Sequence, residues 1–494
     1  MIQRMRPVDA TRLNQTVGVL TTVAAYYFGT GLNGFGPLVW IAPIPVLVLA
    51  FRSSARRSAT IAFVAYVLGS LNIAPYLIEL APPLLVIAAL VVPALTFTLA
   101  VLAQRYAILH GMHWGGVLAF PAAWTSYEFL MSVMAPDGTA LNLAYTQAGL
   151  LPLMQLASVT GIWGISFLVT LVPGGMAAAW YWRRQRQRAL ATFGVPVCLS
   201  LMALSYGWAR LEWSHPEFTL RVGAATTDKS LHQFDASARE QALPVLEAYA
   251  RRIDELARRG AQVVVLPEKF VGVAPAYEEE AIRILSESSS RHHITVVAGL
   301  NRVGRVPERN TAFVLGPDGQ LLVEYDKAFL LSGFERGYER GTSPGLFSVS
   351  GVTAGVAICK DMDFPRWLRR YAADGARIVF VPAWDFVADG PLHARMAVFR
   401  GVEGGFAVVR SAQEGLLTIS DHQGRILAER VSSESDDVLL AGDVPLGPGH
   451  TLYSRAGDWF GAASGLMIVS ILVMVAMRAR RTVTPGLRND PMAP

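Results

Sequence analysis

Long runs of hydrophobic residues fill the first 209 residues of the chain and return once near its C-terminus, whereas such runs are short in between. A helix that crosses the hydrocarbon core of a bilayer needs about 20 mostly apolar residues. Because further runs follow the first one directly, we interpret it as a retained helix rather than a cleavable signal peptide. The pattern predicts about eight membrane-spanning helices, the second of them short, at residues 15–33, 37–51, 59–78, 80–103, 115–134, 160–182, 190–209 and 458–477.

Basic residues are grouped at alternate ends of these runs. Cytoplasmic loops of membrane proteins carry an excess of Lys and Arg, and with eight spans every group falls on one side. We therefore expect both termini, including the tail at 478–494, to be cytoplasmic and the segment between the seventh and eighth spans to lie on the outer face. The groups are Arg4, Arg6 and Arg12; Arg52, Arg56 and Arg57; Arg105; Arg183, Arg184, Arg186 and Arg188; and Arg478, Arg480 and Arg481.

The segment 210–457 has the pattern of an α/β domain. An amphipathic helix is predicted at 236–259, and Gly316–Gly319 reads Gly-Pro-Asp-Gly, a turn between two strands. The chain therefore divides into a membrane domain at 1–209, a domain on the outer face at 210–457, a last helix at 458–477 and a tail. Short runs typical of strands lie at 262–266, 295–300, 311–315, 355–359, 377–381 and 406–410.

Composition narrows the class of protein. Hydrophobic residues make up 52% of the 494 and charged residues only 16%, whereas soluble domains carry about 25% charged residues. One soluble domain is thus excluded, and two cysteines exclude a disulfide scaffold. The net charge of +5 is accounted for by the Arg groups beside apolar runs and does not point to nucleic acid. The sequence has no spacing typical of a zinc site, and we expect no metal.

Three residues of the outer domain could carry chemistry together. Glu268 and Cys359 each come at the end of a predicted strand, and Lys327 follows the hairpin that begins at Asn310. Reactive groups collect at the carboxyl ends of strands in α/β folds. A thiol nucleophile needs a base, and the oxyanion formed on acyl attack needs a positive donor. Each residue alone also fits an ordinary structural position: Glu268 at a strand end, Lys327 on the surface and Cys359 in the core.

Leu266-Pro-Glu268, Tyr325-Asp-Lys327 and Ile358-Cys359, in this order and with these intervals, resemble the Glu–Lys–Cys signature of the nitrilase (carbon–nitrogen hydrolase) superfamily. Eight spans with this domain before the last one resemble the apolipoprotein N-acyltransferases, the membrane branch of that superfamily. Motifs at 141–147, 161–167 and 451–459 add to the resemblance, which covers essentially the whole chain. It implies a multi-pass α-helical membrane domain of about eight spans plus an α/β nitrilase-like α-β-β-α sandwich.

The resemblance also implies roles for single residues. Glu268 resembles the general base, Lys327 the lysine that stabilises the oxyanion, and Cys359 the nucleophile. Glu335 resembles the family's second active-site glutamate, which orients the lysine and the base. The backbone N–H of Lys360 corresponds to the other oxyanion donor.

Three further matches are less specific. Asp361 stands where the acyltransferases have an acidic residue. Trp384 matches a loop tryptophan with a possible part in substrate binding, and Arg410 matches a strand-end arginine. Both also fit a structural role.

The implied activity is acyl transfer in the bacterial inner membrane, with the catalytic domain on the periplasmic face. A membrane phospholipid is the implied acyl donor, Cys359 carries a thioester, and the amino-terminal diacylglyceryl-cysteine of an apolipoprotein is the acceptor. The two half-reactions follow a ping-pong order and need no cofactor.

Departures from the family pattern keep alternatives open. The acyltransferases usually show Tyr-Glu after the nucleophile, where this chain has Lys360-Asp361. One alternative is a membrane-tethered nitrilase-type amidase or hydrolase, or an N-acyltransferase acting on another amine. Another is a catalytically silent membrane scaffold, which the filled triad positions disfavour.

Overall fold

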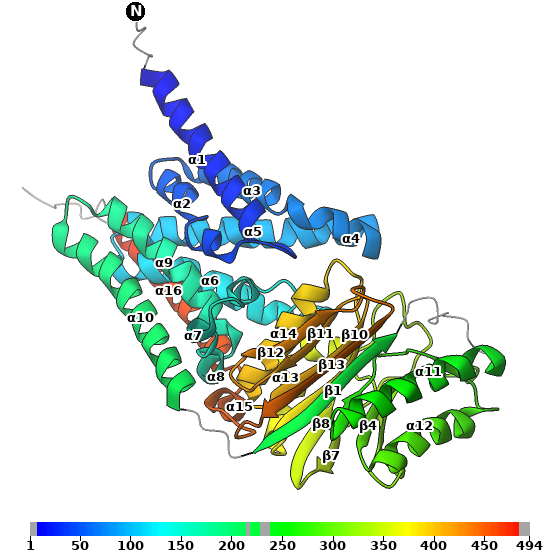
Figure 1. Cartoon of the computed structure of the whole chain (residues 1–494). Coiled ribbons are helices and arrows are strands. Elements are labelled where there is room, and N and C mark those ends of the chain that lie inside the picture. Colours follow the sequence, from blue (N-terminus) through cyan, green and yellow to red (C-terminus); the bar gives the residue numbers. More distant parts are fainter. Residues whose placement is uncertain (1–6, 214–217, 228–237, 484–494) are drawn as a thin grey trace, which may run out of the picture.

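The computed structural model describes residues 7–213, 218–227 and 238–483. Arg4, Arg6 and the end of the expected tail, 484–494, lie outside the described residues. The molecule consists of a helical region and an α/β domain, which meet along the lower end of the helices in Figure 1. The helices are α1 (Pro7–Gly29), η1 (Gly36–Trp40), α2 (Ile44–Ala50), α3 (Ala55–Gly69), η2 (Leu71–Ile73), α4 (Ala74–Leu80), α5 (Pro83–Leu109), α6 (His113–Met134), η3 (Leu143–Gln147), α7 (Leu151–Met154), α8 (Ala157–Thr160), α9 (Ile162–Tyr181), α10 (Arg186–Trp213), α15 (Leu452–Ala456) and α16 (Trp459–Val483).

Five segments of the described chain are long and apolar enough to cross a membrane, by length and composition. They are Ala55–Leu80, Pro83–Leu109, Ile162–Tyr181, Arg186–Trp213 and Trp459–Arg480. Helices α1 and α6 occupy two further predicted spans. The short second span differs from a single helix, because Pro37, Pro43 and Pro45 divide it into η1 and α2. The total of eight spans therefore stays a prediction.

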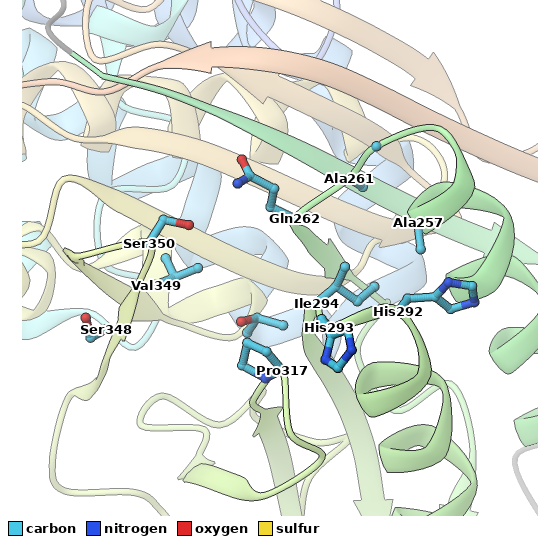
Figure 2. Close-up of a pocket in the computed structure, with 12 residues that line it drawn as sticks. Ala257, Ala261, Gln262, His292, His293, Ile294, Pro317, Ser348, Val349 and Ser350 are labelled. Atoms are coloured by element: carbon cyan, nitrogen blue, oxygen red, sulfur yellow. The ribbon is translucent and has the colours of Figure 1, made fainter.

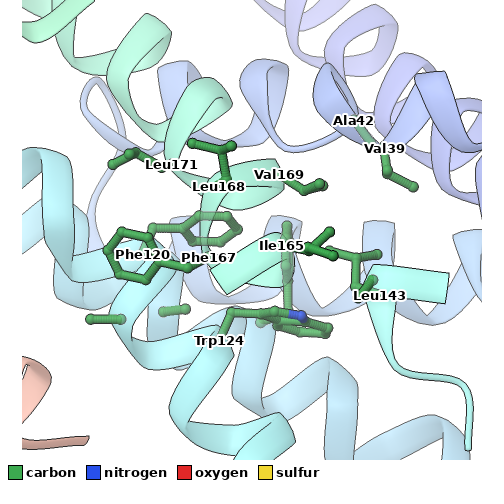
Figure 3. Packing of buried hydrophobic residues seen from close by; sticks show 14 of the residues in the cluster. Val39, Ala42, Phe120, Trp124, Leu143, Ile165, Phe167, Leu168, Val169 and Leu171 are labelled. Carbon is green, nitrogen blue, oxygen red and sulfur yellow. The ribbon is translucent and has the colours of Figure 1, made fainter. Parts of the chain in front are cut away.

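Helix α9 is the centre of the helical region. In its most apolar stretch 83% of the residues are buried, against 17–33% in the other four segments, so the other helices surround it. Figure 3 shows Phe167 of α9 beside Phe120 of α6, in a buried cluster that also contains Leu168, Val169 and Trp124. A Cβ atom on Gly175 would lie 2.6 Å from Pro196 Cγ, so this glycine lets α10 approach α9 closely.

The α/β domain contains two sheets. One has the strand order β13-β1-β2-β4-β5-β6, with β3 paired to β4, and the other has the order β12-β11-β10-β9-β8-β7. The strands are β1 (Thr219–Thr227), β2 (Val263–Val265), β3 (Gly272–Val273), β4 (Thr295–Arg302), β5 (Arg309–Leu315), β6 (Leu321–Asp326), β7 (Gly345–Val349), β8 (Val352–Val356), β9 (Ile378–Trp384), β10 (Ala407–Gln413), β11 (Leu416–Ser420), β12 (Ile426–Val431) and β13 (Asp437–Pro445).

Alternation along the strands explains the layering. Val263 and Val265 of β2 belong to a buried cluster with Phe380 of β9 in the other sheet, whereas Val264 packs with α11 (Arg239–Arg258) and α12 (Glu278–His292). Helices α13 (Pro365–Ala373) and α14 (Gly390–Gly404) cover the outer face of the second sheet. The resulting order of layers is α-β-β-α.

The two ends of the α/β domain are neighbours. Strand β1, which opens the domain, pairs antiparallel with β13, which closes it, in a register from Thr219↔Pro445 to Thr227↔Asp437. Helix α10 precedes β1 and α16 follows β13 along the chain.

The predicted elements are mostly found, with one difference at a critical residue. The predicted helix at 236–259 corresponds to α11, with Ala236 and Ser237 outside the described residues, and Gly316–Gly319 forms the turn between β5 and β6. The strand predicted to end at Cys359 instead ends at Val356. Cys359 begins a 3-10 turn, η5 (Cys359–Asp363), because the Asp361 side chain accepts a hydrogen bond from Ile358 N (2.8 Å) and folds the chain back.

Candidate active site

Glu268, Lys327 and Glu335 form one buried ionic group. Lys327, which directly follows β6, donates from Nζ to Glu268 Oε1 at 2.8 Å and lies 3.1 Å from Glu335 Oε2. All three residues are at most 4% exposed, so the ammonium is compensated by carboxylates rather than by water. Burial lowers the pKa of Lys327, but Glu268 and Glu335 outweigh it and hold that pKa well above its ordinary value.

Asn310 fixes the two glutamates relative to each other. Its Nδ2 donates to Glu268 Oε1 (2.6 Å) and to Glu335 Oε1 (2.7 Å). Glu335 also accepts from Leu331 N (2.7 Å) and pairs with Lys269 (3.1 Å). Burial raises the pKa of Glu335, but Lys327 and Lys269 lower it more, to about 2. Glu335 is therefore an anion that holds Lys327 in place.

Cys359 lies beside this group, on a strained turn. Its φ is +43°, the left-handed region that a non-glycine residue rarely adopts. The Sγ donates to the carbonyl of Trp384 at 3.4 Å. Burial, and then the charge of Glu268, raise the pKa of the Cys359 thiol well above its ordinary value, while Lys327 lowers it. The resting cysteine is thus a thiol next to a carboxylate.

Asp361 supports the turn through hydrogen bonds to its backbone and to neighbouring segments. This fully buried carboxylate accepts from Tyr325 Oη (2.7 Å) and Ile358 N (2.8 Å), and from Ala328 N and Phe329 N. Burial raises its pKa to about 7, while four donors favour the ionised form. It therefore joins the segment after Lys327 to the turn that begins with Cys359.

The side chain of Lys360 points to the helical region. Its Nζ binds Asp137 at 2.6 Å, in the 135–142 loop after α6. The same loop contacts the Cys359 turn again, since Thr139 N and Oγ1 both donate to the Asp363 carbonyl (3.0 and 2.8 Å). The backbone of the turn is thus held by contacts with the helical region as well as by contacts within the α/β domain.

Trp384 and Arg410 differ from the sequence expectation. Trp384 is the last residue of β9 rather than a loop residue, and it meets Cys359 through its carbonyl. Arg410 lies in the middle of β10, not at a strand end, and forms a buried ion pair with Asp385. The Arg410 guanidinium reaches Asp385, in the loop that follows β9, because β9 and β10 are adjacent parallel strands with Arg410 opposite Val381.

Sequence reasoning missed several residues of this region. Asn310 was noticed only as the start of a hairpin, and Asp137, in a loop more than 200 residues before Cys359, carried no local signal. Both act through contacts between distant segments. Among the described residues, no group of three or more His, Cys, Asp or Glu side chains is arranged to hold a metal ion.

A separate cleft of about 340 Å³ lies at the opposite ends of the strands. It is lined by the helix-to-strand connections at His292, His293 and Gln262 and by Ser348 and Ser350 of the β7–β8 turn (Figure 2). Glu268 follows the carboxyl end of β2, whereas Gln262 precedes its amino end. This cleft is therefore remote from Cys359, and we do not assign the chemistry to it.

Comparison with known proteins matches both halves of the chain. Residues 17–175 match the apolipoprotein N-acyltransferase N-terminal domain, and residues 230–446 match the carbon-nitrogen hydrolase family. The chain is 26% identical to the apolipoprotein N-acyltransferase of Geobacter metallireducens, over 91% of this chain and 92% of that protein. It is 27% identical to that of Gloeobacter violaceus, over 96% and 97%.

A solved structure also aligns with part of the chain. An amidase from Nesterenkonia sp. is 21% identical, with a TM-score of 0.39, over 49% of this chain and 94% of that chain. The two matched domains, in this order and on one chain with several apolar helices, identify the protein as a membrane-bound acyltransferase of the nitrilase superfamily that belongs to the apolipoprotein N-acyltransferase family.

Proposed function

We propose that the protein N-acylates the amino-terminal diacylglyceryl-cysteine of apolipoproteins, with a membrane phospholipid as the acyl donor and a thioester on Cys359 as the intermediate. The family supports the substrates. The observation that carries the proposal is the buried Lys327–Glu268 pair beside the Cys359 thiol, on a turn that contacts the helical region through Lys360 and Asp137.

In the first half-reaction, Glu268 accepts the thiol proton as Sγ attacks the ester carbonyl of the phospholipid. Lys327 and Asn310 both donate to Oε1 of Glu268, which leaves Oε2 to receive that proton. Lys327 Nζ and the backbone N–H of Lys360 stabilise the oxyanion. The C–O bond then breaks, the lysophospholipid leaves with the proton from Glu268, and the thioester remains.

In the second half-reaction, the free α-amine of the diacylglyceryl-cysteine attacks the thioester. Glu268 takes a proton from the amine and returns it to Sγ as the C–S bond breaks, which restores the Cys359 thiol while the amide forms. Glu335 keeps Lys327 in position in both steps, and Asp361 holds the turn. Trp384, whose carbonyl meets the thiol, borders the space where an acyl chain would lie.

We also propose the arrangement in the membrane: eight spans, with a domain at 210–457 on the periplasmic face and both termini in the cytoplasm. Helix α9 supports it, because its two ends differ. Ile162 N at its start donates to Glu403 of the α/β domain (2.9 Å), whereas Trp180 near its end is contacted by Arg52 (4.0 Å) and Arg183 (4.3 Å). The basic residues and the α/β domain thus lie at opposite ends of α9, as the positive-inside rule requires.

The test separates the two half-reactions. Purified protein in detergent is incubated with phospholipid, and intact mass is used to detect one acyl chain on Cys359. A synthetic peptide with a diacylglyceryl-cysteine and a free amino terminus is then added. We expect a thioester that persists in water and is discharged within one turnover by the peptide, which gains the acyl chain.

Two controls sharpen the result. The same peptide with an acetylated amino terminus should leave the thioester intact, and Cys359→Ala should carry no label although Cys198 is still present. A label that water hydrolyses at once, or cleavage of small amides without any label, would instead indicate a membrane-tethered hydrolase. Discharge by unrelated amines as fast as by the peptide would indicate a different acceptor.

A further inference from the structure

A short loop beside the nucleophile is held by a side chain from the helical region. This 385–389 loop follows Trp384, whose carbonyl accepts a hydrogen bond from the Cys359 thiol. Tyr76 of α4 donates from Oη to Asp389 Oδ2 at 2.5 Å, across 313 residues of sequence. The contact joins the end of the apolar segment Ala55–Leu80 to the candidate active site.

The loop is in a conformation that needs such support. Val387 has φ +58°, and a β-branched residue in the left-handed region is a strong outlier. Such strain persists only where surrounding contacts determine the conformation. Asp389 supplies one of these contacts, because its Oδ1 accepts from Phe386 N (2.8 Å). Val387 N donates a hydrogen bond to the Glu414 carbonyl (2.9 Å), which is a second contact of this kind.

His393 of α14 extends this support to the nucleophile turn. Its Nε2 lies 3.3 Å from Asp389 Oδ2, and its Nδ1 lies 3.6 Å from Asp363 Oδ1 in η5. Burial lowers the pKa of His393, but Asp363 and Asp389 outweigh it and hold that pKa well above its ordinary value. A cationic imidazolium therefore bridges the carboxylate of the loop and the carboxylate of the turn that begins with Cys359.

We propose that Tyr76 and His393 are positioning residues: acting through Asp389, they hold the 385–389 loop and the Cys359 turn in the arrangement that thioester formation requires. Neither contacts the reacting atoms. The membrane helix thus contributes a polar contact to the geometry of the nucleophile, in addition to the apolar surface expected of it. This inference rests on the acyl transfer proposed above, which it extends to the helical region.

The test compares Tyr76→Phe with Gln155→Met. The first variant removes only the phenolic oxygen at the loop. The second removes another hydrogen bond between the two parts of the molecule, from Gln155 Nε2 to the Gln423 carbonyl (2.8 Å), which does not involve the loop or the turn. For each protein we would measure kcat and KM of thioester formation, the rate of Cys359 alkylation by iodoacetamide, and the Tm.

For Tyr76→Phe we expect kcat to fall about tenfold with KM for phospholipid unchanged, because positioning acts on the reacting geometry rather than on binding. The alkylation rate of Cys359 should change at least about threefold, while Tm stays close to that of the wild type. Gln155→Met should match the wild type in kcat. Equal losses of kcat in both variants, or a wild-type kcat in Tyr76→Phe, would overturn the positioning role.

His393→Gln gives an independent check through the same carboxylate. If both residues act on Asp389, the double variant should be no slower than the slower single variant, and multiplied losses would contradict the shared route. Should the wild-type protein form no thioester with any phospholipid, the proposed function fails. The alkylation comparison then still decides the positioning role: a changed rate in Tyr76→Phe supports it, and an unchanged rate overturns it.

Discussion

The residues around Cys359 keep its thiol protonated at rest. Burial raises the pKa of the thiol, Glu268 raises it further, and Lys327 opposes both. A thiol that stays protonated resists adventitious alkylation and oxidation. In the proposed reaction the thiolate is formed only as the proton moves to Glu268, which ties nucleophile activation to the presence of a substrate carbonyl.

Glu268→Gln should therefore make alkylation of the Cys359 thiol faster and acyl transfer slower. Removing the negative charge lowers the pKa of Cys359, so the midpoint of its alkylation profile moves to lower pH. More of the thiol is then ionised at pH 8, and alkylation should be about three to ten times faster there. Acyl transfer should fall by at least about a hundredfold. Peptide mass spectrometry in a Cys198→Ala background measures the alkylation, and an unchanged profile would contradict the electrostatic account.

Asp361→Asn tests the support of the turn that begins with Cys359. The amide keeps the size of the carboxylate but directs an NH₂ group at backbone N–H groups, so at least one donor among Ile358, Ala328 and Phe329 loses its acceptor. Each such buried donor costs about 1–3 kcal/mol, and we expect a lower Tm together with slower thioester formation. Asp374→Asn, at an exposed helix end, is the matched control; equal Tm values would show that Asp361 is not structural.

At the scale of elements, the 135–142 loop and the η5 turn form one unit although more than 200 residues separate them. Lys360 is 5% exposed while its partner Asp137 is largely open to solvent. The ion pair therefore matters mainly because it prevents an unpaired buried ammonium.

This asymmetry predicts unequal effects of two substitutions. Asp137→Asn leaves the charge of Lys360 without a counter-ion and should destabilise the protein by about 1 kcal/mol and slow thioester formation several-fold. Lys360→Met removes the charge and retains the packing, so its effect should be smaller. Thermal unfolding in detergent and the thioester assay measure both, and a larger loss in Lys360→Met would contradict this interpretation.

The elements also show how much of the fold and of the candidate site could be predicted from the sequence. Runs of apolar residues located the helices, and alternation located the strands, because both depend on local periodicity. The end of β8 was misplaced by three residues because the side chain that turns the chain, Asp361, is held by Tyr325 of β6 and by Phe329 of the segment that follows β6. Asn310 and Tyr76 were not singled out for the site at all, since only tertiary contacts distinguish them. Glu268, Lys327 and Cys359 were singled out because their order and intervals match a known signature, and their catalytic roles stay a prediction.

At the scale of the whole molecule, the start of α9 contacts the α/β domain, whereas Arg52 and Arg183 contact its other end. Single-cysteine labelling tests the resulting orientation. In a background in which both native cysteines are replaced (Cys198→Ala and Cys359→Ala), Val306→Cys in a fully exposed loop of the α/β domain should react with a membrane-impermeant maleimide in cells with a permeabilised outer membrane. Arg184→Cys should react only after the inner membrane is opened. The reverse pattern would invert the proposed topology.

The pairing of β1 with β13 has a consequence for how such a protein could arise. The first and last strands of the α/β domain are hydrogen-bonded neighbours along their whole length, so the chain enters and leaves the domain at one place. A free-standing enzyme with adjacent ends can be spliced into a connection between two helices without pulling them apart. The architecture is the one that a single insertion of an α/β domain between two helices would produce, because neither part would have to change its chain path.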